Sequence, residues 1–312
     1  MCRKHRIDKP YDFAYRIMHN EFPQELHNQL KIPGKFKRKS NVKVHMNDGR
    51  ILEMDSAYIV EPDYKEIFEP MAVNCEHQSG PVDLEKIKII GYYGIQQMHD
   101  ENLPQLSVIA SHIEKEKHVQ MYQRSPSDIV QLYFLDLGEE DNKKRLNNLN
   151  YIINQQDCLS DEDALNIGII PLFAPRDCAC EITEKSIVLY GNVVSMLSQR
   201  MKFTLYSVLH VLTDAFFDDE DEFGRVMSML DEKSEPETVE RFVTLDLAFK
   251  DRDEAFRSRD DAFKDRDEAF RSRDDAFKDR DDALNKVKIA NARISELEKE
   301  NNELKNQLKN VK

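Results

Sequence analysis

AVNCEHQSG, at residues 72–80, is an apolar strand sequence that turns polar at its end. Successive side chains on a strand point to opposite faces, so Glu76 and Gln78 share one face and His77 lies on the other. A strand end of this kind either projects reactive groups into a site or runs out into a surface loop. We interpret His77 as a packing or surface residue and take Glu76 and Gln78 as the candidate reactive groups.

The segments on either side of this strand predict an α/β fold. Their apolar residues recur with helical or strand spacing, bounded by turn residues such as the Asn-Asp-Gly at 47–49. In chain order we expect a helix over 11–32 interrupted before Pro23, two strands over 41–61, a third over 66–79, a helix over 82–99 and a strand over 105–113. This order is typical of an α/β core in which the later helix crosses over between strands.

The rest of the first 233 residues is expected to pack on that core. Residues 128–138 predict a buried strand, and the following segments are mainly helical in spacing. We therefore predict one domain over 1–233, with its core at about 11–125 and a mostly helical accessory part over 126–233. A separate long helix is predicted over 234–312.

Two strand-borne acids are the candidates for chemistry. Asp55 is expected inside the second strand and Glu76 at the end of the third, so the two carboxylates meet at one sheet edge if those strands are neighbours. Mg²⁺ and Mn²⁺ take oxygen ligands and could there polarise a phosphodiester and activate water, with Gln78 orienting the water or donating to the phosphate. Glu53 shares a face with Asp55 and is a rival first acid. Acids at strand ends also occur simply because they are solvent-exposed, and the residues alone leave both interpretations open.

Several other function classes are disfavoured by the sequence. It contains no GxxxxGK[ST], GxGxxG, HExxH or GxSxG motif. Five scattered cysteines lack zinc-site spacing and indicate reduced thiols. No apolar run reaches the 18 or so residues of a membrane span, and no secretory signal is apparent, so we expect a cytoplasmic protein that does not enter a membrane.

The charge is unevenly distributed along the chain. The formal net charge is −14 at pH 7, yet residues 1–50 hold 12 Lys and Arg against 5 Asp and Glu. The basic segment KIPGKFKRKSNVK at 31–43 is the favoured place for contacts with DNA phosphates, because Lys and Arg neutralise the phosphate backbone. The alternative for this segment is a solvated loop.

The last quarter of the chain is a near-exact repeat. Phenylalanine recurs every seven residues from 249 to 277, and Leu284 continues the period. A seven-residue period on a helix favours a left-handed coiled coil. Arg stands three residues after each of these Phe residues, which makes the apolar seam thin. We expect residues 246–312 to form a homo-oligomer, and a solvated single helix is the alternative.

The segment NCEHQSGPVDLEKIKIIGYY, at 74–93, resembles the PD-(D/E)XK nuclease superfamily, and within it the recombination-promoting nuclease and putative transposase branch. The resemblance implies a restriction-endonuclease-like core in which Asp55 and Glu76 hold Mg²⁺ or Mn²⁺ and Gln78 is the third catalytic residue. It also implies that a first-helix acid, Glu21 or Glu25, can assist. Two departures stand out, since Met54 precedes the first acid where the signature has proline, and the signature lysine is replaced by glutamine.

The function we predict from the sequence is a metal-dependent, transposase-like DNA endonuclease that acts in DNA recombination, hydrolyses phosphodiester bonds and assembles through its C-terminal coiled coil. The alternative is a catalytically degenerate adaptor that keeps the nuclease fold and binds nucleic acid or protein. Cleavage that depends on both metal and Glu76 separates the two.

Overall fold

A computed structural model describes residues 10–45, 51–113, 118–155 and 159–244, together with the helical residues Lys288, Asn291, Arg293, Leu297 and Lys299. The chain divides into two compact units, Met1–Val243 and Thr244–Lys312. The predicted coiled coil over 246–312 lies outside the described residues, apart from those five positions.

A mixed six-stranded sheet forms the centre of the first unit. Its strands, in spatial order, are β1 (Lys35–Lys39), β4 (Ser56–Glu61), β5 (Met71–Gln78), β6 (Gln105–Ser111), β8 (Ile129–Asp136) and β7 (His118–Gln123). Strands β5, β6 and β8 run parallel to one another, and the other pairings are antiparallel. The expected α/β class is confirmed. The central strand β5 is buried along almost its whole length, as is usual for a strand with neighbours on both edges and helices on both faces.

The predicted hairpin is present, but its second strand is shorter than expected. Strand β2 (Lys43–His45) pairs antiparallel with β3 (Ile51–Glu53) as a separate two-stranded sheet. The chain then leaves this sheet, and β4 begins only at Ser56, where it pairs with β1 and β5. The expectation that Asp55 lies inside a strand is therefore wrong, because Asp55 occupies the short connection where the chain changes sheets.

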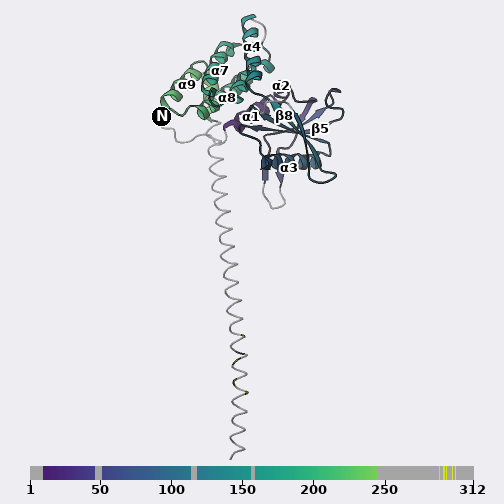
Figure 1. The fold of residues 1–312 in the computed structure, drawn as a ribbon. Coiled ribbons are helices and arrows are strands. Elements are labelled where there is room, and N and C mark those ends of the chain that lie inside the picture. Colours follow the sequence, from purple (N-terminus) through teal and green to yellow (C-terminus); the bar gives the residue numbers. More distant parts are fainter. Residues whose placement is uncertain are drawn as a thin grey trace, which may run out of the picture. The chain divides into compact units, whose positions relative to one another are not determined.

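Helix α3 (Leu84–Glu101) covers one face of the sheet and contacts β5, β6 and β8 (Figure 1). Its apolar side packs Ile90 and Ile95 into a cluster with apolar residues of β6 and β8. Gly94 allows the close approach, because a Cβ at that position would lie 2.6 Å from the Ser107 hydroxyl oxygen. The helix begins at an N-cap, Asp83, whose side chain accepts the Lys86 main-chain N–H at 2.9 Å.

The other face of the sheet is covered by α1 (Pro10–Glu21) and α2 (Pro23–Gln29), which confirms the interruption expected before Pro23. Figure 1 shows these two helices opposite α3. Helix α1 also packs on α8 and α6 and so joins the sheet to a helical layer. That layer consists of α4 (Glu139–Gln155), α5 (Asp161–Ala164), α6 (Asn166–Leu172), α7 (Ala179–Val193), a 3-10 turn (Val194–Met196), α8 (Gln199–Phe216) and α9 (Glu220–Glu232).

The compact unit continues past residue 233, where we expected the long C-terminal helix to begin. The backbone is helical again from 236, and the Phe242 side chain is buried at 1% exposure. Its ring lies 5.5 Å from that of Tyr206 and 4.3 Å from that of His210, centroid to centroid. Within the described ranges, no helix has the length and apolar character needed to cross a membrane.

Candidate functional site

The strand register brings Asp55 and Glu76 together. Ser56 pairs with Cys75, which sets the residue before Ser56 against the residue after Cys75. Asp55 Oδ2 accepts the main-chain N–H of His77 at 2.9 Å, and Glu76 Oε1 accepts the main-chain N–H of Asp55 at 3.4 Å. Each carboxylate is thus held by the backbone beside the other, and the two predicted acids share one place at the end of the sheet.

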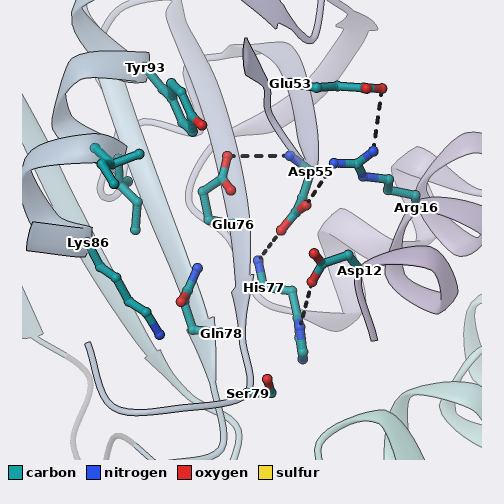
Figure 2. A pocket seen from close by; sticks show the side chains of 12 residues that line it. Asp12, Arg16, Glu53, Asp55, Glu76, His77, Gln78, Ser79, Lys86 and Tyr93 are labelled. Atoms are coloured by element: carbon teal, nitrogen blue, oxygen red, sulfur yellow. Dashed lines mark hydrogen bonds and ion pairs between the residues drawn. The ribbon is translucent and has the colours of Figure 1, made fainter. Parts of the chain in front are cut away.

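These acids line a cavity of about 260 Å³ (Figure 2). Its wall includes both cationic and apolar side chains. From α1 it receives Asp12 and Arg16, from the strands Glu53, Glu76, His77 and Gln78, from the segments beside the strands Asp55 and Ser79, and from α3 Lys86, Ile89, Ile90 and Tyr93. The site therefore lies between two helices on opposite faces of the sheet, at the end where β5 finishes.

Burial raises the pKa of both acids. Asp55 is 8% exposed and Glu76 6%. Burial raises the pKa of Glu76 well above its usual range, and the neighbouring Asp55 charge raises it further. Burial and the Asp12 charge also raise the pKa of Asp55, against the opposing effects of Arg16 and the His77 N–H. Ionisation of both carboxyls is therefore unfavourable in the absence of a bound cation.

Glu53 lies beside the site in a different setting. Its side chain is 49% exposed, and its Oε1 pairs with Arg16 Nη1 at 3.4 Å. The same guanidinium pairs through Nη2 with Asp55 Oδ1 at 3.3 Å. Since Asp55 is buried and adjoins Glu76 whereas Glu53 faces solvent, the geometry favours Asp55 as the first acid of the pair.

His77 contributes its backbone to the site and its ring to the core. The ring stacks on Tyr11 and Tyr15 at 5.8 and 6.1 Å between centroids. Its Nδ1 lies 3.9 Å from Asp12 Oδ1, too far for a hydrogen bond. His77 thus lies on the α1 face as the strand alternation predicts, and packing is its observed environment.

The acid that the first helix places in the cavity is Asp12. Neither Glu21 nor Glu25 lines the cavity. Glu21 instead accepts from Arg200 Nε at 2.9 Å, and Glu25 is in α2. Asp12 is near enough to Asp55 to raise its pKa.

Gln78, Lys86 and Tyr93 complete the polar wall on the α3 side. Figure 2 shows Lys86 reaching from α3 into the same cavity as Gln78. The Lys86 ammonium donates to the Pro81 carbonyl at 3.3 Å. Burial, together with the Glu76 and Asp55 charges, raises the pKa of Tyr93 to about 12, so its hydroxyl stays protonated at neutral pH and can donate a hydrogen bond.

Four of these residues, Asp12, Arg16, Lys86 and Tyr93, were not among our sequence candidates. Helical spacing is the signal that could have found them. Asp12 and Arg16 are four residues apart, and Lys86 and Tyr93 are seven apart, so each pair lies along one face of its helix. The spacing alone does not say which face meets the end of β5.

The donor set of Asp55 and Glu76 fits a hard divalent cation. Across the described ranges, no three His, Cys, Asp or Glu side chains form a ready-made metal cluster. Mg²⁺ is usually bound by one or two carboxylates, with waters and substrate phosphate completing the shell. Two adjoining carboxylates whose charges are poorly neutralised match that requirement, because a cation between them would favour the ionised forms.

The basic segment at 31–43 is part strand and part irregular chain, so it is not wholly the solvated loop that we considered as the alternative. Residues Lys35–Lys39 form the edge strand β1. Lys37 pairs with Glu61 and Arg38 with Glu101, each at 2.8 Å. Phosphate contacts by these two side chains would have to compete with their existing carboxylate partners, and DNA binding by this segment stays a prediction.

No family model, curated protein or solved structure matches this chain. The structure is that of an α/β protein with a buried pair of carboxylates beside a cavity that is also lined by an arginine, a lysine and a tyrosine.

Proposed function

We propose that this chain is a metal-dependent DNA endonuclease of the PD-(D/E)XK type, with a restriction-endonuclease-like core. The observation that carries the proposal is the pairing of Asp55 with Glu76 at the end of β5, where Glu76 accepts the main-chain N–H of Asp55 and Asp55 accepts that of His77. Two buried carboxylates can supply oxygen ligands to a divalent cation, and the hydrogen-bond donors of the adjoining cavity suit a phosphate diester.

The reaction is hydrolysis of one phosphodiester bond. A water oxygen bonds to phosphorus, the bond from phosphorus to one sugar oxygen breaks, the water loses a proton to solvent and the leaving oxygen takes one up. Mg²⁺ or Mn²⁺, when bound by Asp55 and Glu76, would supply Lewis acidity and lower the pKa of water. The Gln78 carboxamide orients the attacking water or donates to a phosphate oxygen.

Lys86 supplies the positive charge that β5 itself lacks. The PD-(D/E)XK signature has a lysine where this strand has Gln78, and Lys86 reaches the same cavity from the first turn of α3. An ammonium fixed at the cavity wall stabilises the negative charge that develops on the phosphate during attack. In this proposal the glutamine and the helix lysine together perform the role of the signature lysine.

The proposal is tested with supercoiled plasmid and purified full-length protein in Mg²⁺, Mn²⁺ or EDTA. We expect nicking that requires metal and is lost in Asp55→Asn and in Glu76→Gln, both of which keep side-chain size. Glu53→Gln tests the rival first acid, and we expect it to retain most of the activity. Metal-dependent nicking that survives both Asp55→Asn and Glu76→Gln would show that the site is elsewhere.

An adaptor without catalytic activity is the second candidate, and the replacement of the signature lysine by Gln78 favours it. Here the nuclease-like unit would bind DNA or protein, and residues 246–312 would assemble the protomers. The wild type would then bind DNA without cutting it in any metal. Deleting 246–312 and measuring mass by light scattering tests the homo-oligomer in both candidates.

A further inference from the structure

Arg16 is a cation of the cavity wall that lies between two carboxylates and makes only long contacts with them. It extends from α1, and its two terminal nitrogens lie 3.3 Å from Asp55 Oδ1 and 3.4 Å from Glu53 Oε1. Charge-assisted hydrogen bonds between arginine and carboxylate are usually shorter, at about 2.7–2.9 Å. The Arg16 side chain is 33% exposed, so neither packing nor short bonds fix the guanidinium firmly.

The Arg16 guanidinium also has N–H groups that are not used in these two contacts. It carries five N–H groups, and its buried Nε has no hydrogen-bond partner among the described residues. A buried donor without a partner is unfavourable, and a second acceptor in the cavity would satisfy it. Phosphate oxygens match the planar fork of arginine, which binds them through two parallel hydrogen bonds.

One carboxylate oxygen of Asp55 accepts a hydrogen bond from the backbone, and the other accepts one from Arg16. Oδ2 accepts the His77 N–H at 2.9 Å, and Oδ1 faces Arg16. A divalent cation that binds Asp55 through Oδ1 therefore meets the positive charge of Arg16 at the same oxygen. The two cations repel each other, and one must move for the other to bind closely.

We propose that Arg16 is a displaceable counter-ion, which neutralises Asp55 in the metal-free protein and turns to the substrate phosphate when a divalent cation takes Asp55. This inference rests on the proposed nuclease function and adds a phosphate-binding residue to it. One side chain then holds the acid pair in its metal-free state and binds the substrate in its metal-bound state.

The two roles predict effects of opposite sign. Removing the Arg16 charge removes the competitor at Asp55, so Arg16→Gln should bind Mn²⁺ about two- to fivefold more tightly, as expected for loss of one partly exposed ion pair. At saturating Mn²⁺ the same variant should cleave plasmid about 100-fold more slowly, since it lacks a donor to the charged phosphate. A purely structural arginine would weaken both properties.

The experiment measures Mn²⁺ affinity by titration calorimetry at pH 8, together with cleavage, in full-length protein. Arg225→Gln is the matched control, because Arg225 pairs with Glu184 away from the cavity, and it should leave both quantities unchanged. Arg16→Lys keeps the charge but not the fork, and should bind Mn²⁺ as the wild type does while cleaving more slowly. The rise in melting temperature on adding Mn²⁺ should be larger for Arg16→Gln than for the wild type.

Unchanged or weaker Mn²⁺ binding by folded Arg16→Gln overturns the counter-ion role, and unchanged cleavage overturns the phosphate role. Both results leave the proposed function intact if the wild type binds Mn²⁺ and cuts DNA. A wild type that neither binds Mn²⁺ nor cuts overturns the nuclease proposal and this inference together.

Discussion

Replacing Glu76 by glutamine is predicted to stabilise the metal-free protein while removing its activity. The Glu76 side chain is buried, and it accepts the Asp55 main-chain N–H at a long 3.4 Å. No ion pair to this carboxylate is seen within the described part of the chain. Its charge is therefore poorly compensated, and a neutral amide of the same shape avoids that penalty.

The size of the effect follows from this setting. A buried polar group that lacks full compensation costs about 1–3 kcal/mol, so Glu76→Gln should gain about that much at pH 8 in EDTA. For a unit of this size, the gain corresponds to a rise of about 2–10 °C in melting temperature. Added Mn²⁺ should raise the melting temperature of the wild type and have little effect on the variant.

The gain should also depend on pH, and the sign follows from the raised pKa of Glu76. In the unfolded chain this carboxyl ionises near its ordinary pKa of about 4.3, whereas in the folded protein it stays protonated to higher pH. The wild type therefore loses stability as pH rises from about 4.3 through the folded-state pKa. The variant has no such group, so the difference between the two grows from pH 4 to pH 8.

Calorimetric melting at several pH values, in EDTA, measures this directly. Glu181→Gln is the control, because Glu181 is exposed and paired with Lys185, and we expect a change within about 0.5 kcal/mol. A Glu76→Gln protein that is no more stable than the wild type at pH 8, or equally more stable at pH 4 and pH 8, would refute the argument from buried charge.

Three further predictions concern the site and the packing around it. Lys86→Ala should slow plasmid cleavage by about 100-fold with little change in melting temperature. The control Lys88→Ala, on the exposed side of α3, should cleave at the wild-type rate. Equal cleavage rates for the two variants would show that Lys86 has no part in the mechanism. Gly94→Ala should cost about 1–3 kcal/mol in urea unfolding, since its Cβ would lie 2.6 Å from a hydroxyl oxygen. Gly224→Ala, with no atom within 4 Å of the new Cβ, should gain up to about 1 kcal/mol. Phe242→Ala should cost about 3–5 kcal/mol in the same assay, and a loss below 1 kcal/mol would show that residues 236–243 do not belong to the compact unit.

The elements that the sequence predicted well have local signals. Helix α3 shows apolar spacing along its length and an N-cap at Asp83, and β5 shows a continuous apolar run. Both patterns depend on residues close in the chain. The sequence predicted that Asp55 and Glu76 would meet only if their strands were neighbours. The pairing of Ser56 with Cys75 supplies that condition, although the strand expected to hold Asp55 ends at Glu53.

The features that the sequence did not predict depend on distant contacts. Strands β1 and β7 have little apolar alternation, and they form by pairing with β4 and β8 at the two edges of the sheet. The change of sheet at Asp55 follows from the pairing of β4 with β1, which no local pattern encodes. Arg16 and Lys86 reach the cavity only because α1 and α3 pack on opposite faces of the sheet near the end of β5.

The change of sheet at Asp55 separates two strand pairings whose registers are set independently. The hairpin keeps its own register, Lys43 with Glu53 through His45 with Ile51, while Ser56 and Cys75 set the acids against each other. Changing the length of a connection between two strands alters the free energy of folding only slightly. Insertions between β2 and β3 should therefore leave the pairing of Ser56 with Cys75 unchanged and the carboxylates in place, which makes this connection a suitable position for grafting new recognition sequences.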